Sequence, residues 1–270
     1  ITIKDLLAHA SGLPAFKQYY KEEKTRELVL ESIYDTVPIK SNRDTTIYSD
    51  VGAIILGEIV EKISGLPLNV FADSMIFKPL GMGTTFFNPP SNKMRRIVPT
   101  EFKPDGTIVH GYVHDENAYS LGGVAGHAGL FSTAKDLAVF SQMMLNDGLY
   151  GWKRIFKTET VNEFTTKANV VDGSSRLLGW DSPGGYASGG IYLSDNSFGH
   201  TGFTGTSMWI DPDQGIIVIL LTNAVHPNRK NKSPKYYDWR QRIHSAVYES
   251  LSIINKNPNL KLRPRWEEGE

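Results

Sequence analysis

The sequence predicts an α/β protein of one domain, in which a mostly helical lobe is followed by a lobe with an antiparallel sheet flanked by helices. Three observations predict this class. Capped helical segments separated by Gly and Pro fill much of the first half, a strand–turn–strand pattern occupies residues 206–223, and a long amphipathic stretch covers residues 235–256. We place the helical lobe at about 1–165 and the α/β lobe at about 166–270.

The first helix is predicted within residues 2–13. Thr2 and Asp5 have the spacing of a capping box, and apolar side chains follow at helical intervals. Gly12 suits the left-handed conformation in which many helices end. His9 then falls inside the helix, and we interpret it as a packing histidine.

Two further helices are predicted in the first lobe. One begins at Ser49 or Asp50 as its cap and ends at Gly65, and its inward positions are Val51, Ile54, Ile55, Ile59 and Ile63. The other begins near Ser132, and its inward positions are Leu137, Phe140, Met143 and Met144.

The second lobe contains the strand patterns. Residues 189–194 form a short strand candidate, and residues 206–223 read as an antiparallel hairpin around a turn at 211–215. The second arm of the hairpin is apolar almost throughout, so we expect helices to cover both of its faces. One of these is the C-terminal helix, with apolar positions Trp239, Ile243, Val247, Leu251 and Ile254.

Composition limits the possible functions. Lys plus Arg and Asp plus Glu both count 29, so the net charge is zero and a nucleic-acid partner is not expected. We interpret the basic cluster at 226–242 as a solvated loop and a helix start. The chain has no cysteine, which excludes disulfides and thiol catalysis, and its apolar runs are too short for a membrane span. No cofactor is expected.

Three stretches carry side chains capable of chemistry. They are Tyr48–Asp50 at the mouth of the second helix, His200–Phe203 just before the hairpin, and residues 114–131 around a glycine-rich loop. Taken alone, Tyr48 could be an aromatic residue packed at a helix entry, and His200 could simply bond a turn.

A metal site is one interpretation of the third stretch. Its candidate ligands, together with a histidine just upstream, are His110, His114, Asp115 and His127. However, no closely spaced pair of histidines lies on a predicted helix. We favour a loop of polar residues (114–117) that lines a cleft rim and hydrogen-bonds the glycine-rich loop.

Five stretches taken in order resemble a known family: residues 2–14, 47–68, 77–87, 125–145 and 199–223. The chain is similar to the serine β-lactamase and penicillin-binding-protein superfamily, in its class C β-lactamase, D-alanyl-D-alanine carboxypeptidase and esterase branch. The resemblance implies a β-lactamase/transpeptidase-like fold. It also implies a serine hydrolase that cleaves amide or ester bonds through an acyl-enzyme, in the periplasm or outside the cell. The implied substrates are D-Ala-D-Ala-type peptides of peptidoglycan, β-lactams or small esters.

The resemblance also implies catalytic roles. Tyr48 takes the place of the tyrosine in the family's Tyr-x-Asn motif and would shuttle a proton. His200 takes the place of the strand-edge lysine and would assist, and the backbone N–H of Phe203 would help to bind the oxyanion.

Substrate binding is implied for Asp50, Thr201 and Gly202. Asp50 stands where the family usually has asparagine, and His200 is an accepted variant of lysine whose charge depends on pH. Both departures favour a peptidase or an esterase over a strong β-lactamase.

The only Ser-x-x-Lys in the chain is Ser132–Lys135. In the family, the nucleophile motif precedes the tyrosine motif, so we interpret Ser132 as a helix cap. The nucleophile, its helix and the first strands of the sheet are then expected upstream of Ile1, and a further domain there is a candidate partner. This chain alone is not expected to complete an acyl-enzyme cycle. The alternatives are a non-catalytic module that binds cell-wall peptide or a partner domain, and a metal-dependent hydrolase.

Overall fold

The computed structural model describes residues 1–22, 25–232 and 234–265, and the chain divides into two compact units. The first unit comprises Ile1–Pro99, Val109–Asp136 and Ala168–Gly179. The second comprises Thr100–Ile108, Leu137–Lys167 and Trp180–Glu270. The chain therefore passes between the units several times, rather than once near residue 165.

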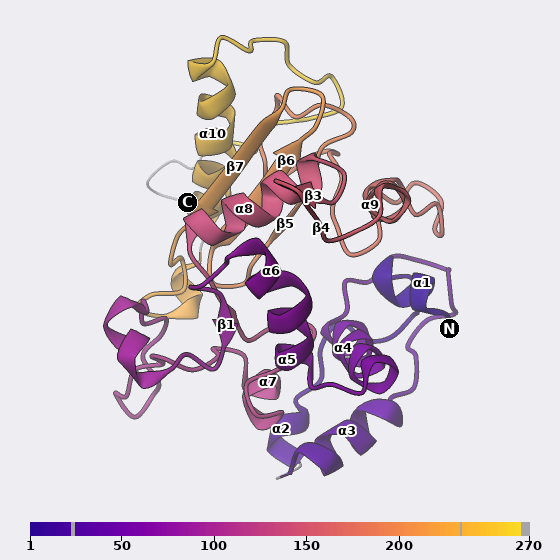
Figure 1. Ribbon diagram of the computed structural model, residues 1–270, viewed down its shortest axis with the longest axis vertical. Helices are drawn as coiled ribbons and strands as arrows, with labels where there is room; N and C mark the ends of the chain where they lie inside the picture. Colours follow the sequence, from indigo (N-terminus) through magenta and orange to yellow (C-terminus); the bar gives the residue numbers. More distant parts are fainter. Residues whose placement is uncertain (23–24, 233, 266–270) are drawn as a thin grey trace. The chain divides into compact units, whose positions relative to one another are not determined.

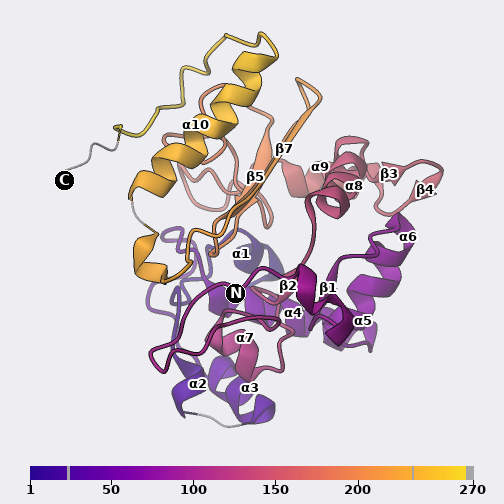
Figure 2. The same ribbon diagram turned by 90° about the vertical axis from the view of Figure 1, so that its left-hand side faces the viewer.

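The first unit is mainly helical (Figure 1). Its elements are α1 (Ile3–Leu7), α2 (Tyr19–Glu22), α3 (Arg26–Tyr34), α4 (Asp50–Ser64), α5 (Leu68–Ala72), a π-helix (Asp73–Phe77), α6 (Lys78–Leu80), β1 (Phe86–Phe87), a 3₁₀-helix (Ser91–Arg96), α7 (Glu116–Ser120) and β2 (Leu130–Phe131). Strand β1 pairs with β2 in antiparallel orientation. Helices α2 and α3 lie side by side (Figure 2).

The predicted capping box at the start of α1 is confirmed. The Asp5 backbone N–H donates to Thr2 Oγ1 at 3.2 Å, and the Thr2 backbone N–H donates to Asp5 Oδ2 at 2.8 Å. The helix ends earlier than predicted, at Leu7, and His9 has a φ of 53° outside it. The reason is tertiary: the His9 carbonyl accepts the backbone N–H of Ile47, so the chain turns away to join a segment far along the sequence.

Helix α4 has the predicted ends. Ser49 is its N-cap and accepts the backbone N–H of Gly52 at 3.0 Å, and Gly65 closes it with a φ of 70°. Four of its five predicted inward residues are buried in the core or pack against it, but Ile63 is 77% exposed. The core of the unit comprises Leu6, Leu13, Tyr19, Val29, Leu30, Ile33, Val51, Ile54, Val113, Ala118, Leu121 and Ala125.

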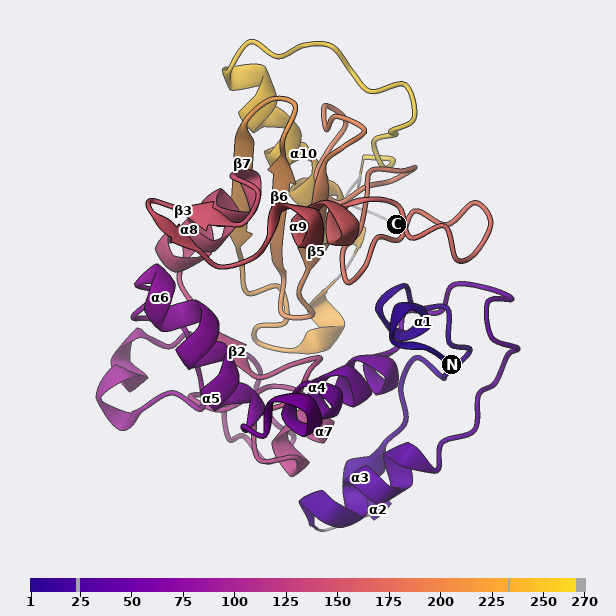
Figure 3. The same cartoon turned by 45° about the vertical axis from the view of Figure 1, so that its right-hand side comes forward.

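The second unit contains a three-stranded antiparallel sheet with the order β5–β6–β7 (Figure 3). Its strands are β5 (Phe198–Thr201), β6 (Thr206–Asp211) and β7 (Ile216–Leu221), so the predicted hairpin is confirmed. The other elements are α8 (Ala134–Leu145), which begins in the first unit, β3 (Leu149–Tyr150), β4 (Lys153–Arg154), α9 (Thr158–Thr165), a 3₁₀-helix (Arg229–Asn231) and α10 (Pro234–Ser250).

The strand predicted at residues 189–194 is absent from the structure. Gly189 lies against the Trp209 indole, where a Cβ would come within 2.7 Å of the ring. The backbone N–H of Ile191 donates to Ser245 Oγ on α10 at 3.2 Å. This segment therefore satisfies its backbone through a helix side chain rather than through a strand ladder.

Helix α10 lies against β7, as predicted, but with a different face (Figure 1). The predicted inward residues Trp239 and Ile243 are exposed, and so is Leu251 beyond the end of the helix. The buried residues are mostly polar: Asp238, Arg240, Gln241, His244, Ser245 and Tyr248. Each finds a partner that the hydrophobic pattern does not reveal; Tyr248, for example, donates its hydroxyl to Asp211 Oδ2 at 3.0 Å.

His244 on this face makes stability depend on pH. The side chain is 0% exposed, and its Nε2 lies 2.9 Å from Ser207 Oγ. Burial, and then the nearby charge of Arg240, lower its pKa from 6.5 to about 4. Below about pH 6.5 the unfolded chain binds a proton that the folded chain does not, so the free energy of unfolding falls as the pH falls toward 4.

We expect this loss to amount to about 3 kcal/mol between pH 7 and pH 4. Urea denaturation at a series of pH values measures it, with His244→Gln as the comparison. The variant should lose less stability than the wild type over this range. Equal losses in the two proteins would contradict the assignment.

Candidate active site

Tyr48 lies at the entrance of α4 and is 41% exposed. Its ring centroid is 4.5 Å from that of His9, and the guanidinium carbon of Arg176 lies 5.4 Å from the Tyr48 ring centroid. No motif in the sequence points to Arg176, which is far from Tyr48 along the chain. A cation beside a phenol favours the phenolate form.

The backbone around Tyr48 is fixed by hydrogen bonds to residues 9–15. The Ser49 N–H donates to His9 Nδ1 at 3.1 Å, and Ser49 Oγ donates to the Pro14 carbonyl at 2.7 Å. The Asp50 N–H donates to the Ala15 carbonyl at 2.9 Å. His9 is therefore a packing and hydrogen-bonding residue, but it does not lie in a helix as predicted.

Asp50 is the first residue of α4 and is half-buried. Burial raises its pKa; the charge of His127 acts in the opposite direction, and the charge of Asp115 adds to the rise. His127 and Asp115 come from the third stretch. Both belong to the same unit as Asp50, so two of the three stretches singled out in the sequence lie in one unit.

Asp115 and His127 form a hydrogen bond of 2.8 Å between Oδ1 and Nε2. This confirms the predicted bond between the polar loop and the glycine-rich loop. Asp115 is also the N-cap of α7, accepting the N–H of Ala118 at 2.8 Å. Burial would raise the pKa of Asp115, but the hydrogen bond and charge of His127, together with backbone N–H groups, hold it below its usual value.

The second predicted group lies at the end of β5, in the other unit. Strand β5 pairs with β6 on one side, and within the described residues its other side carries only an isolated bridge between Gly199 and Asp181. His200 and Thr201 are half-buried, and His200 Nδ1 lies 2.9 Å from the Thr201 carbonyl. The Gly202 N–H donates to the Thr206 carbonyl at 2.8 Å, which holds the chain at the turn after the strand.

Phe203 follows this turn and is 55% exposed. Its carbonyl accepts Lys232 Nζ at 2.6 Å, and the same ammonium lies 4.7 Å from the Phe203 ring centroid. Burial, and then the charge of Arg240, lower the pKa of Lys232. The basic cluster at 226–242 was predicted to be a solvated loop and a helix start. Arg240 is only 7% exposed, so this prediction does not hold for every residue of the cluster.

Ser132 does not act as the cap of α8. That role belongs to Thr133, whose Oγ1 accepts the Asp136 N–H at 3.3 Å. Ser132 Oγ instead forms a 2.8 Å hydrogen bond with Thr85 Oγ1. Ser132 is thus a structural hydroxyl that joins this segment to the residues before β1.

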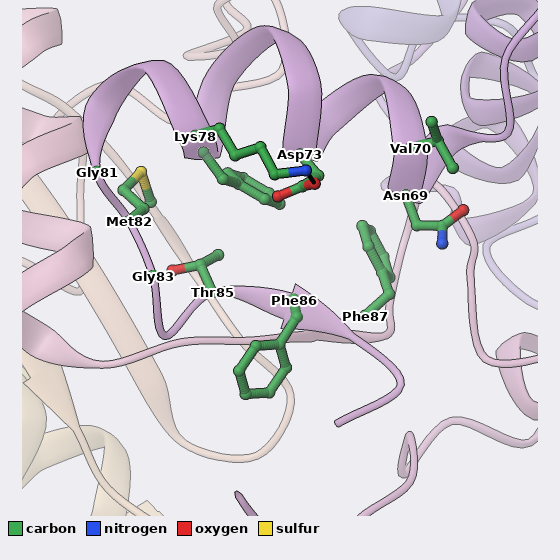
Figure 4. Close-up of a pocket in the computed structure, with 11 residues that line it drawn as sticks. Asn69, Val70, Asp73, Lys78, Gly81, Met82, Gly83, Thr85, Phe86 and Phe87 are labelled. Carbon is green, nitrogen blue, oxygen red and sulfur yellow. Dashed lines mark ion pairs between the residues drawn. The ribbon is translucent and has the colours of Figure 1, made fainter. Parts of the chain in front are cut away.

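A pocket of about 730 Å³ lies between the helical run α5–α6 and β1 (Figure 4). Phe77, Phe86 and Phe87 contribute to its wall, and Lys78 forms a 2.6 Å ion pair with Asp73. None of the predicted site residues lines this pocket. Its wall comes entirely from the first unit.

Two features that other functions would require are absent from the described part of the chain. No group of three or more His, Asp or Glu side chains there is arranged to hold a metal ion. Within residues 1–22, 25–232 and 234–265, every helix falls short of the length and apolarity that a membrane crossing requires.

Solved structures with this architecture are β-lactamase-like. A β-lactamase from Sulfitobacter sp. EE-36 aligns with a TM-score of 0.67 and 19% identity, covering 93% of this chain and 71% of that one. A β-lactamase from Mycobacterium bovis aligns with a TM-score of 0.61 and 22% identity, covering 92% of this chain and 74% of that one. These similarities confirm the predicted fold class.

Sequence comparison identifies the family of the chain. A family model described as Beta-lactamase matches residues 1–242, and the chain belongs to this family. An Escherichia coli (strain K12) protein named "Putative D-alanyl-D-alanine carboxypeptidase" is 38% identical over 255 residues, covering 84% of this chain and 57% of that protein. A Bacillus subtilis (strain 168) N-acetylmuramyl-L-alanine amidase is 37% identical over 286 residues, covering 93% and 64%. The chain thus spans less than two thirds of the length of these relatives.

Proposed function

We propose that the full-length protein carrying this chain is a serine hydrolase of the β-lactamase and penicillin-binding type, acting on peptide amide or ester bonds through an acyl-enzyme. The observation that carries the proposal is Tyr48 at the mouth of α4 with Arg176 beside its ring, in a chain of this family. D-Ala-D-Ala-type peptides are the substrates we favour, because relatives bear carboxypeptidase and amidase names. Such substrates place the protein in the periplasm or outside the cell.

Tyr48 is the proposed proton shuttle. Acylation requires a base that removes the proton of a serine hydroxyl and passes it to the leaving group. The phenolate of Tyr48 can accept that proton, and Arg176 stabilises the phenolate. Asp50, two residues further on, is proposed to bind the substrate.

The end of β5 carries the other residues with proposed roles. His200 would assist the proton transfer, and Thr201 would bind the substrate. The small Gly202 would let the substrate backbone approach closely. The Phe203 N–H would donate to the oxyanion. Lys232 donates to the Phe203 carbonyl, in the next peptide group, and so helps to fix the Phe203 backbone.

The nucleophile is proposed to lie in the part of the full-length protein outside residues 1–270. The only Ser-x-x-Lys of the chain supplies a structural hydroxyl at Ser132. Treatment of the full-length protein with a fluorophosphonate or a penicillin, followed by peptide mapping, tests this. We expect an adduct on a serine outside the chain.

Other outcomes of this experiment have distinct meanings. An adduct on Ser132 would overturn its structural assignment. If neither reagent leaves an adduct, a non-catalytic module that binds cell-wall peptide becomes the better description. In a separate activity assay, loss of activity with a chelator, restored by zinc, would instead identify a metal-dependent hydrolase.

A further inference from the structure

Residues 168–179 form a loop of the first unit, and this loop brings Arg176 to the ring of Tyr48. The end of the loop is anchored, because the Gly179 N–H donates to the carbonyl of Leu7, the last residue of α1, at 3.0 Å. An arginine side chain has several rotatable bonds, so an anchored loop end does not by itself fix the guanidinium beside the ring. A contact closer to Arg176 has to do so.

A single oxygen atom, Ser174 Oγ, joins this loop to the segment that carries Tyr48. It accepts the Thr46 hydroxyl at 2.9 Å and the Arg176 backbone N–H at 3.2 Å. Thr46 lies two residues before Tyr48, and Ser174 lies two residues before Arg176. The two segments therefore run side by side in the same direction, with one contact between the hydroxyls and the next between the cation and the ring.

The backbone on the tyrosine side of this pair is held independently of the loop. The Ile47 N–H donates to the His9 carbonyl at 2.9 Å, and the Ser49 N–H donates to His9 Nδ1 at 3.1 Å. The Tyr48 ring also faces the His9 imidazole, with 4.5 Å between the ring centroids. The distance between the guanidinium and the phenol therefore depends on how the loop is held.

We propose that the Ser174 hydroxyl sets the position of Arg176 beside Tyr48. Ser174 and Thr46 are then positioning residues, because their hydrogen bond fixes the register between the two segments. The guanidinium stabilises a phenolate only while it stays close to the ring, since the attraction between charges weakens with distance and with screening by water. This inference rests on the proposed function, in which the Tyr48 phenolate accepts a proton.

A double-mutant cycle in the full-length protein tests the proposal. Ser174→Ala removes the oxygen that both donors use, and we expect it to lower kcat/KM for a D-Ala-D-Ala peptide about 10- to 100-fold, as a misplaced catalytic group does. In the Arg176→Gln background, which has no cation to position, the same change should alter kcat/KM less than about threefold. Equal losses in the two backgrounds would overturn the proposal, because a purely structural role does not depend on residue 176.

Two further variants test the hydrogen bond itself. Thr46→Val removes the donor with little change in shape and should lower kcat/KM in the same direction as Ser174→Ala; a Thr46→Val protein with wild-type kcat/KM would overturn the proposal. Ser41→Ala is the matched control, because Ser41 is an exposed serine of the same unit. Its activity should stay within about twofold of the wild type. Thermal denaturation of each variant confirms that the compared proteins are folded.

A second measurement does not depend on activity. In protein with tyrosine labelled with ¹³C at Cζ, the resonance that Tyr48→Phe removes reports the ionisation of Tyr48. Ser174→Ala should make this resonance titrate at a higher pH than in the wild type, because the stabilising cation is displaced. His9, whose ring also faces Tyr48, is the same in both proteins. Identical titrations would overturn the proposal. If no substrate is hydrolysed, the proposed function fails, but this titration still decides whether Ser174 positions Arg176.

Discussion

Replacing Tyr48 with phenylalanine in the full-length protein is expected to lower kcat/KM about 10²- to 10⁴-fold, which is the usual contribution of a positioned acid–base group. The change removes one oxygen and leaves the ring that contacts His9 and Arg176. Because Tyr48 is 41% exposed, the fold should be unaffected. Steady-state hydrolysis of a D-Ala-D-Ala peptide and of an activated ester measures the loss.

Tyr119→Phe is the matched control. Tyr119 is in the same unit and is 61% exposed, but it lies on α7, with its ring 5.3 Å from that of Tyr112. Its hydroxyl has no proposed part in the reaction, so activity should stay within about twofold of the wild type. A Tyr48→Phe enzyme with normal kcat/KM would remove this tyrosine from the mechanism.

Gly126→Ala is expected to lower the free energy of unfolding by about 3 kcal/mol, near the top of the range for overpacking. The added Cβ meets the Ala53 carbonyl at 2.0 Å, and both sides of the contact are backbone. Neither can move aside as a flexible side chain would. The loop must therefore separate from α4, and His127 moves with it. Urea denaturation followed by circular dichroism measures the change.

Gly83→Ala provides the comparison. Apart from the two chain neighbours, no atom of the described residues lies within 4 Å of a Cβ at Gly83, and no left-handed φ restricts that position. Its stability should stay within about 0.5 kcal/mol of the wild type. If Gly126→Ala proved equally harmless, the loop and the helix would have to be less closely packed than the structure describes.

Local signals in the sequence predicted the local structure. The Thr2–Asp5 box, the Ser49 cap, the Gly65 end and the β6–β7 hairpin all depend on residues within a few positions of one another. Where distant segments compete for the backbone, prediction failed. Residues 189–194 bond to Ser245 instead of to a strand, and α10 buries polar side chains that find partners elsewhere in the unit.

The candidate site likewise contains residues that local motifs predicted and a residue that they did not. Tyr48, Asp50 and the His200–Phe203 stretch were found because each belongs to a short motif. The bond between Asp115 and His127 was anticipated, because a polar loop and a glycine-rich loop stood close together in the sequence. Arg176 was not found, since no pattern in the sequence relates it to a tyrosine so far away.

The hydrogen bonds between residues 9–15 and residues 47–50 hold together the two ends of a long intervening segment, residues 16–46. Residues 16–45 could therefore be exchanged for another segment with Thr46 and Tyr48 kept in register. The new segment would have to replace the core side chains Tyr19, Val29, Leu30 and Ile33, and would have to supply a partner for the buried Asp5 carboxylate, which Arg43 pairs in this structure. Protein engineers could therefore reshape this part of the surface while Tyr48 keeps its place.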